Sequence, residues 1–301
     1  MAQRVARLPR ADARSGSLAI SWPLVQRLLG RFGLHLLAIL IGAALALPLF
    51  WAVTSSLKQA HEVRQMPPLW FPSVLQWQNY PAVWGSRLFA IWTWNSVYLT
   101  VIATVGTVLS SSVGGYAFAR LRFPGKRLLF GVTLATMMLP GYVLLIPNYL
   151  LFWKLGWLNT YLPLTIPHFF GAAFFIFLFR QFFLTIPLDL DEAARIDGAG
   201  YPRIFWSIVL PLSGPVFATA AIIESIRSWN SFLWPLIILN SQASYPLAVG
   251  LRYLRSNVEE SGPKDHLLMA GAIMMALPVI VVFYVGQRYF VRGIAMTGIK
   301  G

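Results

Sequence analysis

The chain has 301 residues, of which 57% are apolar and only 11% are charged. A soluble domain carries about 25% charged residues, so this composition indicates a lipid bilayer as the main solvent. The formal net charge is +14, but the basic residues lie at the ends of apolar segments and form no patch with interleaved aromatic residues. That distribution indicates membrane topology and argues against nucleic-acid binding.

Several functions are excluded by patterns that the sequence lacks. It contains no cysteine, which excludes disulfides and thiolate metal sites. No hydrolase nucleophile motif and no phosphate-binding loop is present, so we expect neither enzyme activity nor a bound cofactor. The four histidines have no metal-ligand spacing, so no metal is expected and each is interpreted as structural or interfacial. They are His35, His61, His168 and His266.

Six apolar stretches are long enough to cross a bilayer as helices. They are approximately Leu34–Ser55, Asn95–Ala119, Leu128–Trp153, Leu162–Phe183, Val209–Leu239 and Leu267–Tyr289. The predicted fold class is therefore an all-α polytopic membrane protein with six transmembrane helices. The fifth stretch contains Pro215 and Pro235, so we expect it to bend, or to end early and continue along the outer interface.

The distribution of Lys and Arg predicts the orientation, because both residues favour the cytoplasmic side. With the N-terminus inside, sixteen of the 24 basic residues lie inside and seven outside, leaving out Arg227 within the fifth stretch. Both termini are therefore predicted to be cytoplasmic. Residues 1–30 form a basic cytoplasmic segment without the pattern of a cleavable signal peptide, and residues 31–301 form the transmembrane domain.

The predicted cytoplasmic loop at about residues 186–211 has the pattern of two short helices joined by a turn. Asp189 or Asp191 is expected to cap the first helix, with Glu192 in its first turn, where negative charge suits the helix dipole. Gly198 stands where a left-handed helix stop favours glycine. Pro202 suits the first turn of the second helix.

The chemistry of this loop is typical of a docking element. Ala193 and Ala194 offer a small face that another backbone can approach, and Glu192 and Asp197 place charge beside it. The loop holds four of the ten acidic residues of the chain, on the side of the membrane where basic residues dominate. We therefore expect a protein partner that offers basic or hydrogen-bond donor groups.

This pattern resembles the EAA loop of the permease subunits of ABC importers. In that family the short helix of the loop, the coupling helix, docks in a cleft on the ATPase subunit. The resemblance implies an ATPase-coupling role for the matching residues, which are Glu192, Ala193, Ala194, Asp197, Gly198, Leu210 and Pro211. Three further segments are similar to maltose-type sugar permeases, and the chain looks most like the smaller, six-span partner of the pair. These segments are Tyr116–Lys126, Ser228–Leu236 and Gln287–Gly293.

The resemblance implies a type I ABC importer permease in the bacterial inner membrane, surrounded by lipid, that takes up a sugar or oligosaccharide, including an acidic one. It implies a second permease subunit, two ATPase subunits that hold ATP and Mg, and a periplasmic or lipid-anchored solute-binding protein. An ion-gradient-driven secondary transporter is the alternative, although only Glu224 supplies a carboxylate within a predicted span. An ABC permease for a non-sugar solute is a second alternative function.

Polar residues within the spans are the candidates for a substrate path. Glu224 and Arg227 are three residues apart on one helix, so they either pair with each other or line the path. Trp229 and Asn230 suit sugars by stacking and hydrogen bonding, unless Trp229 belongs to the interfacial belt of aromatic residues. Tyr142 and Asn148 are further candidates, because nearby prolines can open the third stretch.

Overall fold

The computed structural model describes residues 22–256 and 264–298, and all regular secondary structure in those ranges is helical. The chain divides into two compact units, residues 1–51 and residues 52–301, which are described separately. The first unit contains most of α1 (Trp22–Ser56). The predicted basic segment, residues 1–30, lies outside the described residues as far as residue 21.

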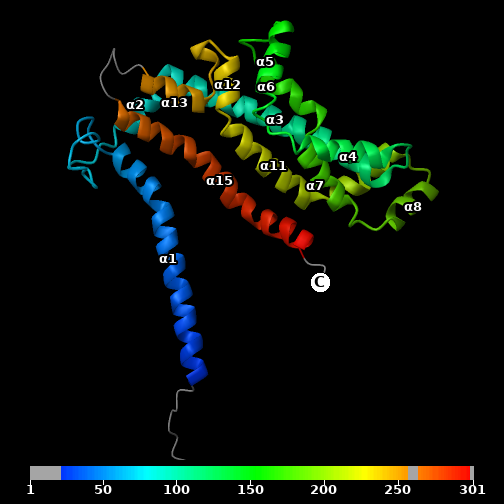
Figure 1. Cartoon of the computed structure of the whole chain (residues 1–301). Coiled ribbons are helices and arrows are strands. Elements are labelled where there is room, and N and C mark those ends of the chain that lie inside the picture. The colour runs from blue at the N-terminus through cyan, green and yellow to red at the C-terminus, as the bar shows by residue number, and fades with distance from the viewer. Residues whose placement is uncertain (1–21, 257–263, 299–301) are drawn as a thin grey trace, which may run out of the picture. The chain divides into compact units, whose positions relative to one another are not determined.

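The second unit is built around four helices that pack along one another (Figure 1). These are α3 (Arg87–Arg120), α7 (Ala173–Phe183), α11 (Gly214–Trp229) and α15 (Asp265–Gly298). Shorter helices connect them in chain order. These are α2 (Asn79–Trp84), α4 (Lys126–Thr136), α5 (Leu145–Lys154), α6 (Leu162–Thr165), η1 (Ile166–Phe170), α8 (Asp189–Ile196), α9 (Tyr201–Ile204), η2 (Phe205–Val209), α10 (Leu210–Leu212), α12 (Leu233–Ile238), η3 (Gln242–Ser244) and α13 (Leu247–Ser256).

Four helical segments among the described residues are long and apolar enough to cross a membrane. They are Arg31–Ser56, Arg87–Arg120, Leu162–Phe183 and Asp265–Gln287. A fifth candidate consists of Tyr201–Leu212 and Gly214–Trp229, which meet at an angle of 81°. The bend, which was one of the two outcomes expected for the fifth apolar stretch, is therefore confirmed.

The third apolar stretch differs from the expectation of one continuous span. Residues 128–153 form most of α4 and most of α5, separated by a non-helical segment at residues 137–144. Pro140 lies in this segment, and proline lacks the N–H that a continuing helix would need. This stretch is therefore two short helices instead of the single helix that its hydropathy predicts.

Helix α3 is the central element of the second unit, because it packs along α7 and α11, and α11 packs in turn along α15. The contact with α7 depends on Gly115 of α3. A Cβ atom at Gly115 would lie 2.6 Å from Cβ of Phe179 and 3.0 Å from the backbone nitrogen of Arg180. Small residues of this kind allow close helix packing where lipid offers no hydrophobic driving force.

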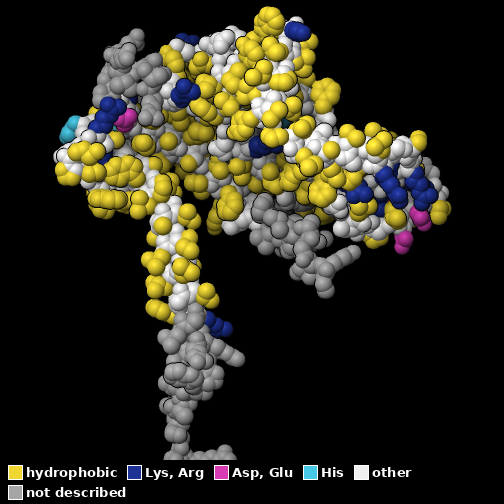
Figure 2. Space-filling model, viewed as in Figure 1, with side chains coloured by type: hydrophobic (Ala, Val, Ile, Leu, Met, Phe, Trp, Pro, Cys, Tyr) yellow, Lys and Arg dark blue, Asp and Glu magenta, His cyan; other side chains and the backbone are white. Residues whose placement is uncertain are grey.

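The visible surface of the second unit separates apolar from charged side chains (Figure 2). Hydrophobic side chains are frequent across its middle, whereas Lys, Arg and acidic side chains gather at the end that carries α4 and α8 and are also visible at the opposite end. Exposed apolar residues such as Val101, Val113 and Leu128 contribute to this unit's surface. A surface of this kind suits contact with lipid and leaves α8 at a polar boundary.

Candidate functional site

Helix α8 occupies the position of the predicted first loop helix. Glu192 lies in its first turn, as expected, together with Asp189 and Asp191. The expectation that one of these aspartates caps the helix is wrong, because Leu188 is the N-cap and no side chain caps the helix start. Gly198 has a φ of +79°, which confirms the left-handed helix stop.

The two alanines of α8 face different surroundings. Ala194 is buried in a core cluster with Phe183, Ile186 and Phe205, whereas Ala193 is exposed. The expectation of a shared alanine face is therefore wrong. Consecutive residues on a helix with 3.6 residues per turn point in different directions, so Ala194 turns toward the core and Ala193 does not. Glu192, Ala193 and Asp197 remain exposed and accessible to a partner.

The remaining two residues of the predicted coupling set lie in α10, beside the 81° bend. Leu210 packs against the same core cluster as Ala194, and Pro211 is exposed in the first turn of α10. Both segments therefore join one core, through which the exposed face of α8 is connected to the helices of the bent candidate span.

A cavity of about 410 Å³ lies among α3, α5, α6, η1, α11 and α12. It contains four of the predicted substrate-path residues, which are Tyr142, Asn148, Glu224 and Arg227. Five polar or aromatic lining residues were not predicted as path residues, and these are Ser96, His168, Ser228, Ser231 and Trp234. A concave site lined by a few converging polar groups and by aromatic side chains is typical of a small-molecule site.

Trp229 and Asn230 are absent from the described lining of this cavity. Trp229 is buried in a second core cluster, and its Nε1–H donates a hydrogen bond of 3.0 Å to the carbonyl of Met275. Asn230 Nδ2 donates within its own helix, to the carbonyl of Ile226 at 2.8 Å. Both side chains therefore form structural contacts here, and Trp234 supplies the aromatic face instead.

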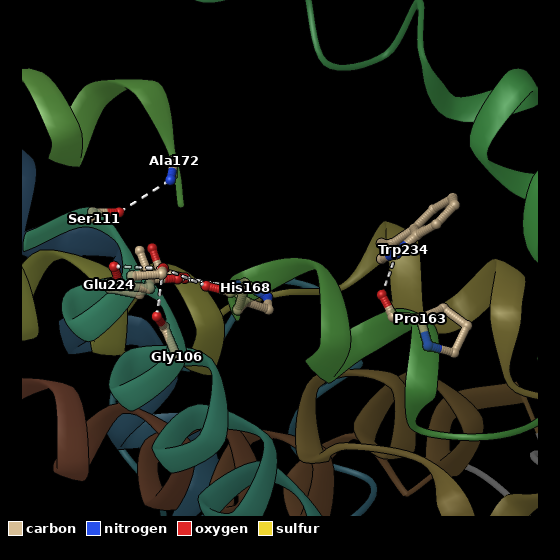
Figure 3. Close-up of polar contacts among 9 residues, drawn as sticks. Gly106, Ser111, Pro163, His168, Ala172, Glu224 and Trp234 are labelled. Carbon is tan, nitrogen blue, oxygen red and sulfur yellow. Dashed lines mark hydrogen bonds and ion pairs between the residues drawn. The ribbon is translucent and has the colours of Figure 1, made fainter. Parts of the chain in front are cut away.

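The spacing of three residues on one helix would allow Glu224 to pair with Arg227, but the two side chains form no ion pair. Its Oε1 lies 3.3 Å from Nδ1 of His168, and only 2% of the Glu224 side chain is exposed (Figure 3). Arg227 is exposed on the cavity wall and forms no ion pair within residues 22–256 and 264–298. The expected local pair is thus replaced by a contact between two helical segments.

His168 is the functional candidate that the sequence reasoning missed. We interpreted the four histidines as structural or interfacial because they lack metal-ligand spacing. A different signal was present, because His168 is an ionisable residue within the predicted span Leu162–Phe183. Ionisable residues inside a membrane segment are candidates for function irrespective of metal spacing.

Comparison with known proteins agrees with this architecture. Residues 106–296 match the family described as binding-protein-dependent transport system inner membrane component. The chain is 38% identical over 232 residues to the arabinooligosaccharides transport system permease protein AraQ of Halalkalibacterium halodurans, covering 76% of this chain and 81% of that protein. It is also 38% identical over 265 residues to the sn-glycerol-3-phosphate transport system permease protein UgpE of Yersinia enterocolitica, covering 85% and 93%.

A solved structure shares the fold. It is the crystal structure of a bacterial ABC transporter involved in the import of the acidic polysaccharide alginate. One of its chains superposes with a TM-score of 0.76 at 27% identity, covering 88% of this chain and 98% of that chain.

These features define a multi-pass inner-membrane permease with the type I ABC importer fold. The chain belongs to the family of binding-protein-dependent transport system inner membrane components, of the carbohydrate-transporter type. A permease of this family works in an ABC importer with a binding protein and an ATPase, and the partner ATPase hydrolyses the ATP.

Proposed function

We propose that this permease imports a sugar or oligosaccharide and that its cavity forms part of the path. The observation that carries the proposal is the gathering of Arg227, Ser228 and Ser231 with Trp234 in one cavity. Hydroxyl and guanidinium groups hydrogen-bond sugar oxygens, and an indole packs on the apolar face of a sugar ring. The name of the Halalkalibacterium relative, which refers to arabinooligosaccharides, supports the same solute class.

The rest of the proposed assembly consists of a second permease subunit, which completes the path, and two ATPase subunits beneath the pair. A periplasmic or lipid-anchored binding protein delivers the solute. Both termini and α8 lie on the cytoplasmic side, where basic residues are most frequent. Glu192 and Ala193 of α8 and Asp197 at its C-cap face the ATPase, because their side chains are exposed and the EAA resemblance covers them.

An anionic solute is a second candidate, which Arg227 supports. Its guanidinium lines the cavity without an acidic partner among the described residues, whereas Glu224 lies against His168. A guanidinium binds carboxylate and phosphate groups in a planar, bidentate manner. The names of the Yersinia relative and of the alginate transporter each refer to an anionic compound.

The proposal is tested with the complex purified through this subunit and reconstituted in lipid. ATP hydrolysis is measured with and without the binding protein, using arabinotriose, an alginate trisaccharide and sn-glycerol 3-phosphate as solutes. We expect hydrolysis to rise only when the binding protein and one of these solutes are both present. Arg227→Gln should reduce the response to an anionic solute more than the response to a neutral one.

The same preparation tests the docking face of α8. Charge reversal in Glu192→Lys should lower both the amount of ATPase subunit that copurifies and the rate of solute uptake. If the permease purifies without any ATPase, or if the Glu192 variant retains full recruitment and uptake, the coupling role of α8 is refuted. Uptake driven by an ion gradient without ATP would instead support a secondary transporter.

A further inference from the structure

The candidate span Leu162–Phe183 is interrupted near its middle. Helix α6 ends at Thr165, a 3-10 turn follows at Ile166–Phe170, and α7 begins only at Ala173. Gly171 between them has a φ of +80°, which favours glycine. Backbone groups within a bilayer need partners in the protein, so irregular backbone persists there only where it is buried or lines a cavity.

Hydroxyl groups of α3 supply partners at this interruption (Figure 3). Ser111 Oγ accepts a hydrogen bond of 3.0 Å from the backbone N–H of Ala172. Ser110 Oγ lies 2.6 Å from the carbonyl of Gly106 and 3.0 Å from the carbonyl of His168, so its one proton is shared between these two acceptors. Gly106 of α3 permits the close approach, because a Cβ atom there would lie 3.0 Å from the ring of Phe169. The interruption is therefore stabilised by the neighbouring helix.

The interrupted segment places His168 at the cavity wall. Its Nδ1 lies 2.9 Å from the Thr107 hydroxyl of α3 and 3.3 Å from the Glu224 carboxylate of α11. Thr107 and Glu224 are both buried, whereas 32% of the His168 side chain is exposed and lines the cavity. Two buried groups from different helices thus orient one accessible imidazole ring.

These contacts engage only one ring nitrogen of His168. No contact of Nε2 is found among the residues that the structure describes. A carboxylate only accepts hydrogen bonds, so Glu224 favours a proton on Nδ1. Nε2 is then an acceptor in neutral imidazole and a donor in imidazolium, and a hydroxyl group can pair with either form.

We propose that His168 is a solute-contacting residue whose Nε2 hydrogen-bonds a hydroxyl group of the imported sugar. Glu224 is a positioning residue that acts through His168 and holds its ring toward the cavity. This inference rests on the proposed sugar-import function. It adds that this subunit recognises a hydroxyl group of the solute. It assigns a role to the buried carboxylate of α11 without requiring an ion-coupled mechanism.

The test compares parent and deoxy sugars in the reconstituted full transporter with its binding protein. The parent sugar is whichever of arabinotriose and the alginate trisaccharide the wild-type transporter imports, and each monodeoxy derivative competes with it for uptake. Each variant is compared with the wild-type permease using the same binding protein. Any preference of the binding protein among the sugars is then the same in both measurements and cancels in their ratio. Loss of one hydrogen bond corresponds to about a fivefold change in discrimination.

In His168→Phe, the preference for the parent sugar over one particular deoxy derivative should fall about fivefold, and the preferences over the other derivatives should be unchanged. Glu224→Leu should weaken the same preference, whereas Glu224→Gln should retain it, because its amide keeps an acceptor oxygen beside Nδ1. Phe170→Leu is the matched control, since it changes the same interrupted segment at an exposed apolar side chain and should leave every preference intact.

An unchanged preference profile in His168→Phe, at any uptake rate, refutes the proposal, because a structural role would scale the uptake of all derivatives equally. His168→Leu gives the same measurement if the phenylalanine variant does not assemble. If Glu224→Gln loses the preference as fully as Glu224→Leu, the positioning role is refuted. A wild-type transporter that imports neither sugar refutes the sugar-import function itself, which distinguishes that failure from the failure of this proposal.

Discussion

Arg120 at the end of α3 and Asp191 in α8 form a buried ion pair. Arg120 Nε lies 3.5 Å from Asp191 Oδ2, and the two side chains are 1% and 4% exposed. Arg120 Nη2 also donates a hydrogen bond of 2.6 Å to the carbonyl of Ile186, just before α8. The helix that is proposed to dock on the ATPase is therefore attached directly to the central membrane helix.

Removal of one partner should destabilise this attachment strongly. Asp191→Ala leaves the Arg120 guanidinium buried without its carboxylate, and breaking a buried pair costs about 3–5 kcal/mol. Asp189→Ala, in the same turn but exposed, should cost little. Thermal unfolding of the purified transporter and the yield of copurified ATPase measure both effects. Similar losses in the two variants would show that the buried pair has no special role.

Substitution of Gly198, just after α8, should be unfavourable because of its backbone conformation alone. A Cβ atom at Gly198 would meet nothing within 4 Å, but its φ of +79° costs an ordinary residue about 1–2 kcal/mol. Gly198→Ala should therefore weaken recovery of the ATPase by about fivefold or more, and Gly198→Asn by less, because asparagine tolerates this conformation.

Gly214→Ala is the control for this substitution, since its Cβ atom also meets nothing within 4 Å and its φ is not positive. Recovery of the ATPase after purification through the permease is the measurement. Equal recovery with Gly198→Ala and Gly214→Ala would mean that the left-handed stop does not matter for docking.

The packing of α3 on α7 predicts a steric effect at Gly115. In Gly115→Ala the new methyl group would overlap Cβ of Phe179, so the two helices must move apart, at a cost of about 1–3 kcal/mol. Gly131→Ala in α4 adds the same atom where nothing lies within 4 Å and should be neutral or slightly stabilising. Thermal unfolding in detergent compares them, and an unchanged midpoint for Gly115→Ala would contradict the packing.

A pH effect is expected at Glu62, in the segment after α1 and outside the membrane-spanning helices. A hydrogen bond from the Ser73 side chain, with further bonds from the backbone N–H groups of Ser73 and Gln59, holds the pKa of Glu62 below its ordinary value of 4.5. Because the folded pKa is the lower one, the stabilisation is present above pH 4.5 and is lost as the pH falls through the folded pKa.

Glu62→Gln tests this linkage. The unfolding midpoint of the wild-type protein should exceed that of the variant near pH 7, and the difference should shrink as the pH is lowered below 4.5. Unfolding of both proteins is followed at several pH values in the same detergent. A difference that is constant across this range would rule out Glu62 as the titrating group.

Local properties of the chain determined much of what was predicted. Hydropathy is additive along a segment, so it located the candidate spans, and prolines marked the bend of the fifth stretch. Gly198 follows the end of α8 because a helix commonly stops at a residue with a left-handed backbone conformation, and glycine adopts this conformation without strain. The EAA pattern was recognisable for the same reason, since its helix and turn are set by residues a few positions apart.

The tertiary structure alone decided which side chains meet across different helices. Helical spacing suggested Arg227 as the partner of Glu224, but α11 and η1 both pack on α3, and this brings His168 to that carboxylate. Trp229 is buried by a cluster with residues of α3, α13 and α15, whereas Trp234 of α12 lines the cavity. Sequence spacing describes neighbours on one helix, whereas the burial of a side chain depends on which other helix covers it.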